Sequence, residues 1–106
     1  MPLDLPDLKE DTSTSTSTDK LWQVVLLDDD MHTYDYVIEM LMDIFNHPIE
    51  LAYRMACDVD KDKRVIVDVD TKKTATSKCR RIQDFGPDWR IKRSKGSMRA
   101  VIEPVD

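Results

Sequence analysis

The stretch WQVVLLDDDMHTYDYVIEMLMDIF, residues 22–45, decides the fold of this 106-residue chain. Its first six residues are mostly apolar and rich in β-branched side chains, and the run stops at three aspartates, which is typical of a buried strand. The apolar residues that follow recur at helical spacing and predict a helix over residues 32–45. They form one stripe, made of Tyr34, Val37, Ile38, Leu41, Ile44 and Phe45.

A second helix follows the first almost at once. Asn46-His47-Pro48 ends the first helix and begins the next, because proline suits the first turn of a helix. The second helix has its own apolar stripe, made of Ala52, Met55, Ala56 and Val59. Since the link between the two helices is so short, we expect them to form a helical hairpin.

The remaining sequence contains two more strands and one more helix. Residues 60–64 are predicted to form a polar turn, and residues 65–69 (VIVDV) a second strand. Thr71 can cap a third helix that stops at Gly86. The apolar stripe of this helix is Ala75, Cys79 and Ile82. Residues 88–96 are predicted to be a loop, and residues 98–103 a third strand.

This element order, β-α-α-β-α-β, predicts an α+β fold. Three strands alone cannot cover both faces of a sheet, so we expect three helices packed on one face of a small three-stranded antiparallel sheet. Residues 20–106 would form this single domain. Residues 1–19 are predicted to be a disordered N-terminal extension, because the TSTSTST run cannot bury apolar surface.

The composition excludes several classes of function. The net charge of −5 argues against nucleic acid as the main partner. No apolar run approaches the roughly 20 residues that span a bilayer. Cys57 and Cys79 form no CxxC pair, and we expect buried, reduced thiols in a cytoplasmic monomer. The chain has only two glycines, Gly86 and Gly96, which excludes a glycine-rich phosphate loop and a nucleophile elbow.

Candidate metal motifs are equally sparse. His32 and His47 have no second ligand at a metal spacing. A D-x-D-x-D run from Asp58 resembles the start of a calcium loop, but Lys63 replaces the required glycine and Val69 the final glutamate. Taken alone, these features support a small α/β binding domain with an acidic corner. We expect no enzyme, no cofactor and no metal, and a metal-dependent enzyme is the least favoured alternative. The aspartates at 28–30 either offset the dipole of the following helix or hold a cation, which could be an ammonium group or a metal.

The order of these motifs resembles the ClpS family of adaptors for ATP-dependent Clp proteases. That family has an aromatic-led strand, N-D-D, a short link, and a helix carrying F-V or Y-V; here this reads W-Q-V-V-L-L-D-D-D-M-H-T-Y-D-Y-V. The match continues through the hairpin to T-K-K-T-A-T-S-K, residues 71–78, in place of the family's T-x-E-x-A-E-x-K, and to the final M-R-A-V-I-E. It covers about three quarters of the chain. Residues 86–96 differ from typical members and are similar to a divergent branch.

The resemblance implies an adaptor that binds proteins with a large hydrophobic N-terminal residue (an N-degron). It would deliver them to the N-terminal domain of a ClpA- or ClpC-type AAA+ unfoldase. In the family an Asn-Asp pair and a His hold the free α-ammonium, which by position implies Asp28, Asp29 and Asp60 here. The residues implied for the hydrophobic pocket are Leu26, His32, Tyr34, Val37, Ala56 and Val59. Lys78 matches a lysine on the unfoldase-facing side.

Several of these positions depart from the family pattern. Asp28 replaces Asn, and Asp60 replaces His, so the site is more negative. Tyr34 replaces a pocket Met while Ala56 replaces another, a pair of changes that can compensate in volume. The added charge suits an α-ammonium, whose pKa near about 8 keeps it charged at pH 7. It also suits a divalent cation, so the alternative is the same fold binding another partner or a cation at this acidic corner, without N-degron activity. We expect the three aspartates to converge on one cation.

Overall fold

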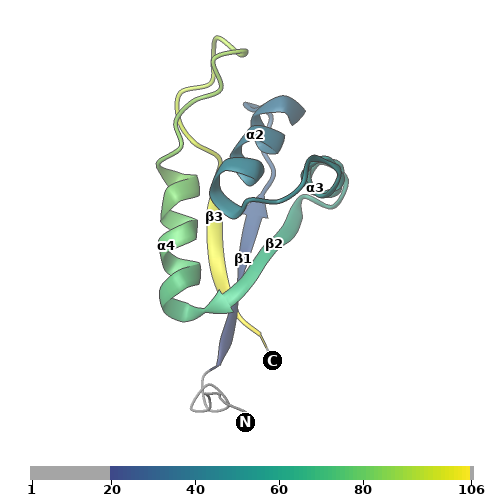
Figure 1. The fold of residues 1–106 in the computed structure, drawn as a ribbon. Coiled ribbons are helices and arrows are strands. Elements are labelled where there is room, and N and C mark those ends of the chain that lie inside the picture. The colour runs from purple at the N-terminus through teal and green to yellow at the C-terminus, as the bar shows by residue number, and fades with distance from the viewer. Residues whose placement is uncertain (1–19, 106) are drawn as a thin grey trace.

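The computed structural model describes residues 20–105, and the predicted disordered extension, residues 1–19, lies outside this part. Six elements follow in the predicted order (Figure 1). They are β1 (Leu21–Leu27), α2 (Tyr34–Phe45), α3 (Ile49–Asp62), β2 (Arg64–Thr71), α4 (Lys72–Gln83) and β3 (Ala100–Pro104). The predicted β-α-α-β-α-β arrangement is therefore confirmed.

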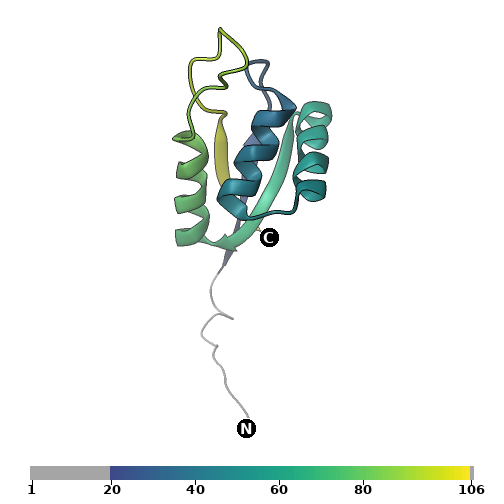
Figure 2. The ribbon, with the colours of Figure 1, turned by 45° about the horizontal axis from the view of Figure 1, so that its top comes forward.

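The three strands form one antiparallel sheet in the order β2-β1-β3, with β1 in the centre. The register between β1 and β2 shifts between Val24 and Val25, where a bulge interrupts the ladder. Figure 2 shows α4, α2 and α3 side by side on one face of this sheet. The predicted α+β fold, with three helices on one face of a three-stranded antiparallel sheet, is confirmed.

The core lies between the sheet and the helices. The predicted apolar stripes supply most of it, including Leu41 with no exposed surface and Val37 at 4%. Tyr34 is an exception, since 40% of its surface is exposed; it lies in the first turn of α2, and Tyr36 and Met40 occupy core positions on that helix instead. Cys79 is buried, but Cys57 is only half-buried, so the expectation of two buried thiols was wrong for Cys57.

Helix ends differ from the predictions in two places. Residues 60–62, predicted as part of a turn, belong to the last turn of α3, and the link to β2 is the single residue Lys63. Lys63 adopts a left-handed conformation (φ 72°) and its N–H donates to the carbonyl of Val59 at 2.9 Å, which closes the helix without a glycine. The helix α4 ends at Gln83, before the predicted stop at Gly86. Thr33 and Thr71 cap α2 and α4 with their side chains.

On the face of the sheet without helices, polar side chains from all three strands interact with one another. Val25 lies on this face by strand alternation and is nevertheless fully buried. Arg64 on β2 reaches Glu103 on β3 at 2.6 Å, and Gln23 on β1 donates to the same carboxylate oxygen at 3.1 Å. Within residues 20–105, no helix is long and apolar enough to cross a membrane.

Candidate functional site

The acidic corner, by which we mean Asp28, Asp29 and Asp60, forms where β1 ends. The N–H of Leu27 donates to the carbonyl of Arg99 at 3.0 Å, and the N–H of Asp28 donates to the carbonyl of Lys63, also at 3.0 Å. The end of β1 is thus fixed on one side by the residue before β3 and on the other by the residue between α3 and β2. The Asp28 carboxylate forms an ion pair with the Lys63 ammonium at 3.5 Å.

Asp29 is oriented by the turn that follows it. Its Oδ1 accepts a hydrogen bond from the N–H of Met31 at 2.9 Å and lies 2.7 Å from Nδ1 of His32. Nε2 of His32 lies 2.7 Å from the carbonyl of Gly96, so the ring is held between the Asp29 carboxylate and the backbone of the loop. The His32 side chain is 3% exposed and that of Asp29 is 22% exposed. The Asp29 carboxylate is therefore fixed in orientation but still accessible.

Tyr34 and Asp60 connect the two helices of the hairpin at the same end. The Tyr34 hydroxyl, in the first turn of α2, donates to Oδ2 of Asp60 in the last turn of α3 at 2.6 Å. The hydrogen bond to Asp60 is the main reason that the pKa of Tyr34 rises to about 12. The ring of Tyr34 also meets that of Tyr53 edge-on, with centroids 6.4 Å apart.

The remaining pocket residues lie in the core. Four of them share almost complete burial and belong to one apolar cluster: Leu26, Val37, Ala56 and Val59. Leu26 precedes the acidic corner on β1, and Val59 precedes Asp60 on α3, so the apolar wall and the carboxylates are neighbours along the same elements. In this structure the wall is closed to solvent.

The three aspartates each have a different partner in the structure. Asp28 pairs with Lys63, Asp29 with His32, and Asp60 with Tyr34. Over residues 20–105, no group of three or more His, Cys, Asp or Glu side chains is placed to hold a metal ion. The described part of the chain thus offers no ligand set for a divalent cation at this corner.

Lys78 lies away from the corner, on α4. Its ammonium is 3.6 Å from Oδ2 of Asp68 and 5.5 Å from the centre of the Phe45 ring. That oxygen of Asp68 is buried and has no hydrogen-bond partner among the described residues. The positive charge of the Lys78 ammonium therefore offsets the cost of burying this oxygen.

The role of Asp88, which begins the predicted loop of residues 88–96, was not identified from the sequence. Its side chain is fully buried and accepts hydrogen bonds from the N–H (2.7 Å) and the hydroxyl (2.8 Å) of Thr33, and from the N–H (3.0 Å) and guanidinium (3.1 Å) of Arg90. Burial opposes its ionisation, but the bonds from Thr33 and Arg90 outweigh it and lower the pKa of Asp88 to about 2. The Asp-x-Arg spacing after Gly86-Pro87 was the only local signal of this turn.

Asp88 connects the loop of residues 84–99 to the start of α2. The Thr33 that it binds is the N-cap of α2 and follows His32 directly. The Ser94 hydroxyl accepts from the N–H of Asp88 at 2.9 Å, and the Ser97 hydroxyl accepts from the N–H of Gly86 at 2.6 Å. These bonds hold the loop over the corner, where Gly96 meets His32.

Comparisons with known proteins agree on one family. The family model described as ATP-dependent Clp protease adaptor protein ClpS matches residues 17–88. An adapter protein ClpS of Campylobacter jejuni (strain RM1221) is 32% identical over 80 residues, which is 76% of this chain and 83% of that protein. The adapter protein ClpS of Acetivibrio thermocellus is 29% identical over 97 residues, covering 92% of this chain and 93% of the relative.

A solved structure has the same fold. It is that of Agrobacterium tumefaciens ClpS2 bound to L-phenylalaninamide, with a TM-score of 0.72 and 23% sequence identity. The match covers 82% of this chain and 99% of that one. The similarity therefore extends over the whole of the other domain.

Proposed function

The chain belongs to the ClpS family of ATP-dependent Clp protease adaptor proteins, and from this premise we propose that it binds proteins by a large hydrophobic N-terminal residue. We further propose that it delivers them to a ClpA- or ClpC-type AAA+ unfoldase. The ligand of the similar ClpS2 is L-phenylalaninamide. That molecule has a free α-amino group, a benzyl side chain and an amide in place of the carboxylate, so chemically it represents the first residue of a protein.

The observation that carries the proposal is the position of Asp29 beside the apolar wall. Its carboxylate is oriented through Oδ1 by His32 and Met31, and the other oxygen, Oδ2, makes no hydrogen bond within the described residues. An α-ammonium at Oδ2 would place the attached side chain near the end of β1, where Leu26 begins the apolar wall. A carboxylate is the natural partner of a group that is charged below about pH 8.

Tyr34 would act as a gate to this wall. Leu26, Val37, Ala56 and Val59 are closed to solvent, and we propose that a ligand side chain reaches them when Tyr34 turns away from Asp60. That movement frees the Asp60 carboxylate, which can then accept a hydrogen bond from the arriving ammonium. The ligand ammonium would thus replace the Tyr34 hydroxyl as the hydrogen-bond donor to Asp60.

The other properties follow from an adaptor role. We infer that the protein acts without catalysis or a cofactor, as a cytoplasmic monomer, and that Lys78 lies on the surface that meets the unfoldase. Asp28 would contribute to the charge of the corner through its field, since its own carboxylate is paired with Lys63.

Calorimetric titration with short peptides tests the proposal. A peptide beginning Phe-Ala-Ala should bind with its N-terminus free and lose at least about ten-fold in affinity when acetylated, since acetylation removes the charge and leaves Asp29 unpaired. Asp29→Asn should cause a similar loss, whereas Asp30→Asn should not, because the Asp30 side chain is 80% exposed. Equal binding of free and acetylated peptides would show that the ammonium site does not exist.

The alternative of a cation site is tested in the same experiment. Mn²⁺ and Ca²⁺ should give no heat of binding, in line with the lack of a three-ligand cluster over residues 20–105. Metal binding that Asp60→Asn abolishes, together with no peptide binding, would favour the alternative.

A further inference from the structure

A cavity beside Asp29 brings the acidic corner together with a set of cations. It has a volume of about 340 Å³ and is lined by Asp29, Met31, His32, Arg93, Lys95, Gly96, Ser97 and Arg99. One wall is therefore the carboxylate and imidazole of the corner. The opposite wall is the loop of residues 84–99, which contributes three positively charged side chains.

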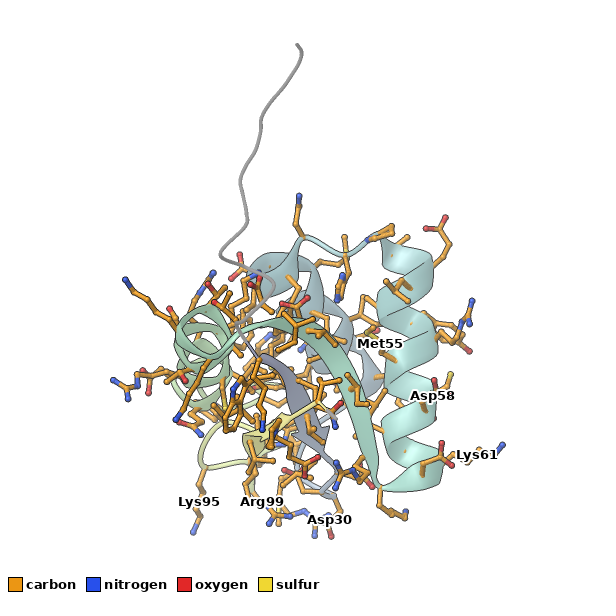
Figure 3. The ribbon with its side chains drawn as sticks, turned by 90° about the horizontal axis from the view of Figure 1, so that it is seen from below. Asp30, Met55, Asp58, Lys61, Lys95 and Arg99 are labelled. Carbon is orange, nitrogen blue, oxygen red and sulfur yellow. The ribbon has the colours of Figure 1, made fainter. Side chains whose placement is uncertain are left out.

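The segment of residues 89–99 is positively charged, whereas the whole chain is negatively charged. Between residues 89 and 99 there are five basic side chains and no acidic one, in a protein of net charge −5. Arg93 approaches Asp30 only loosely, at 3.9 Å. Lys95 and Arg99 form no ion pair with any carboxylate of residues 20–105. Figure 3 shows both of them on the same side of the molecule as Asp30, projecting outward.

The backbone at these cations is held in place by the fold. The Arg99 carbonyl accepts from Leu27 at the end of β1, which positions Arg99 directly beside the strand that leads into the acidic corner. Gly96, next to Lys95, is held by His32 at 2.7 Å. The buried Asp88 secures the start of the same loop to Thr33. The backbone that carries the two exposed cations is therefore ordered before an anion arrives, and only their side chains have to adjust.

We propose that this cavity selects substrates with an acidic residue at the second or third position, directly after the hydrophobic N-terminal residue. The inference rests on the proposed function, because the α-ammonium at Asp29 sets the starting point of the substrate chain. Successive residues of an extended chain advance by roughly 3.5 Å. The side chains of the second and third residues would therefore lie close to Asp29, within reach of the positively charged wall of the same cavity. There Lys95 and Arg99 can pair with a carboxylate.

The test compares peptides that differ only in these positions. Phe-Glu-Ala and Phe-Ala-Glu peptides should bind the full-length protein about two- to five-fold more tightly than Phe-Ala-Ala, the gain expected of exposed ion pairs. Phe-Lys-Ala should bind more weakly than Phe-Ala-Ala. The differences should shrink at 0.5 M salt, because salt screens exposed charges.

Variants identify the cations that cause the preference. Lys95→Glu and Arg99→Glu should remove or reverse the preference for glutamate, while affinity for Phe-Ala-Ala is retained, which also shows that each variant is folded. Lys92→Glu is the matched control: it makes the same charge change in the same loop, but Lys92 does not line the cavity, and the preference should remain.

The outcomes separate this inference from the proposed function. If all Phe peptides bind equally, but only with free N-termini, the cavity has no role in selection and the proposed function stands. If the glutamate peptides bind more weakly than Phe-Ala-Ala, the cavity disfavours acidic residues and the inference is wrong. If no Phe peptide binds at all, the proposed function fails and this inference with it.

Discussion

Asp88 shows how a single residue holds the site together. Its fully buried carboxylate accepts four hydrogen bonds, two from Thr33 and two from Arg90. Asp88→Ala removes all four and leaves partly buried donors of Thr33 and Arg90 without this partner, so we expect it to lower the free energy of unfolding by about 3 kcal/mol. Urea denaturation measures this directly. As a control, Asp84→Ala in the same loop, where the side chain is exposed, should cost less than about 0.5 kcal/mol.

The same residue predicts how stability depends on pH. Because the pKa of Asp88 is lowered to about 2 from an ordinary 3.8, its ionised form stabilises the folded state. This contribution is fully present above about pH 4 and is lost as the pH falls to about 2, an effect of about 2 kcal/mol. Unfolding at pH 5 and pH 2.5 should reveal the step in the natural protein and not in Asp88→Asn. Glu103, whose pKa is also lowered by Arg64, titrates in both proteins. An identical loss of stability in the two would contradict the prediction.

The hydrogen bond of Tyr34 leads us to expect that removing its hydroxyl strengthens peptide binding. If its bond to Asp60 must break before a ligand side chain enters, Tyr34→Phe should bind a Phe-Ala-Ala peptide several-fold more tightly, since the phenylalanine ring can turn away without losing a hydrogen bond. Calorimetric titration of the variant beside the natural protein measures this. Weaker binding would show instead that the hydroxyl contacts the ligand.

At the level of elements, α2 depends on its central leucine. Leu41 has no exposed surface and lies in the cluster between α2 and the sheet. Leu41→Ala should lower the free energy of unfolding by about 2–5 kcal/mol, as other large-to-small core substitutions do. Its neighbour Met42 is 40% exposed, and Met42→Ala should cost far less. A cost below about 0.5 kcal/mol for Leu41→Ala would mean that the leucine does not support the core.

The elements were predictable from sequence where apolar spacing determines them. The stripe through Val37 and Leu41 has only one helical arrangement that buries it. In the short run VIVDV at 65–69, the β-branched residues predict a strand, although only Val67 is buried and Ile66 and Val69 are exposed. The end of α3 was not predictable in this way, because Lys63 adopts a left-handed conformation that usually belongs to glycine or asparagine. Local patterns contain no signal for such a residue.

The candidate site was less predictable than the fold. The acidic residues at the end of β1 were evident from the sequence, whereas the hydrogen bond between Tyr34 and Asp60 was not predicted. The contact between Asp88 and Thr33 joins residues 55 positions apart, and the bond between His32 and Gly96 joins residues 64 apart. Because such contacts depend on how a long loop folds back, no spacing rule predicts them. The expectation that three aspartates share one cation stays a prediction; in the structure each of the three has a partner of its own, Lys63, His32 or Tyr34.

For the whole molecule, the remaining question is what the first 19 residues contribute. The described part of the chain begins at Lys20, one residue before β1. Removing residues 1–19 should shift the melting temperature by no more than about 2 °C, because the Thr/Ser run of residues 12–18 has no apolar surface to bury and only three leucines precede it. Affinity for a free Phe-Ala-Ala peptide should also be retained.

The same truncation should impair delivery. A flexible extension raises the effective concentration of one bound partner near another, so its loss should slow degradation of a substrate with an N-terminal phenylalanine by a ClpA- or ClpC-type protease, while peptide binding stays intact. Degradation rates with the full chain and with residues 20–106 measure this, and a variant in which residues 12–18 are replaced by glycine and serine should restore the rate only if length, and not sequence, is what matters. A fall in melting temperature of 10 °C or more on truncation would show instead that residues 1–19 belong to the folded domain, and the loss of delivery could then be explained by unfolding alone.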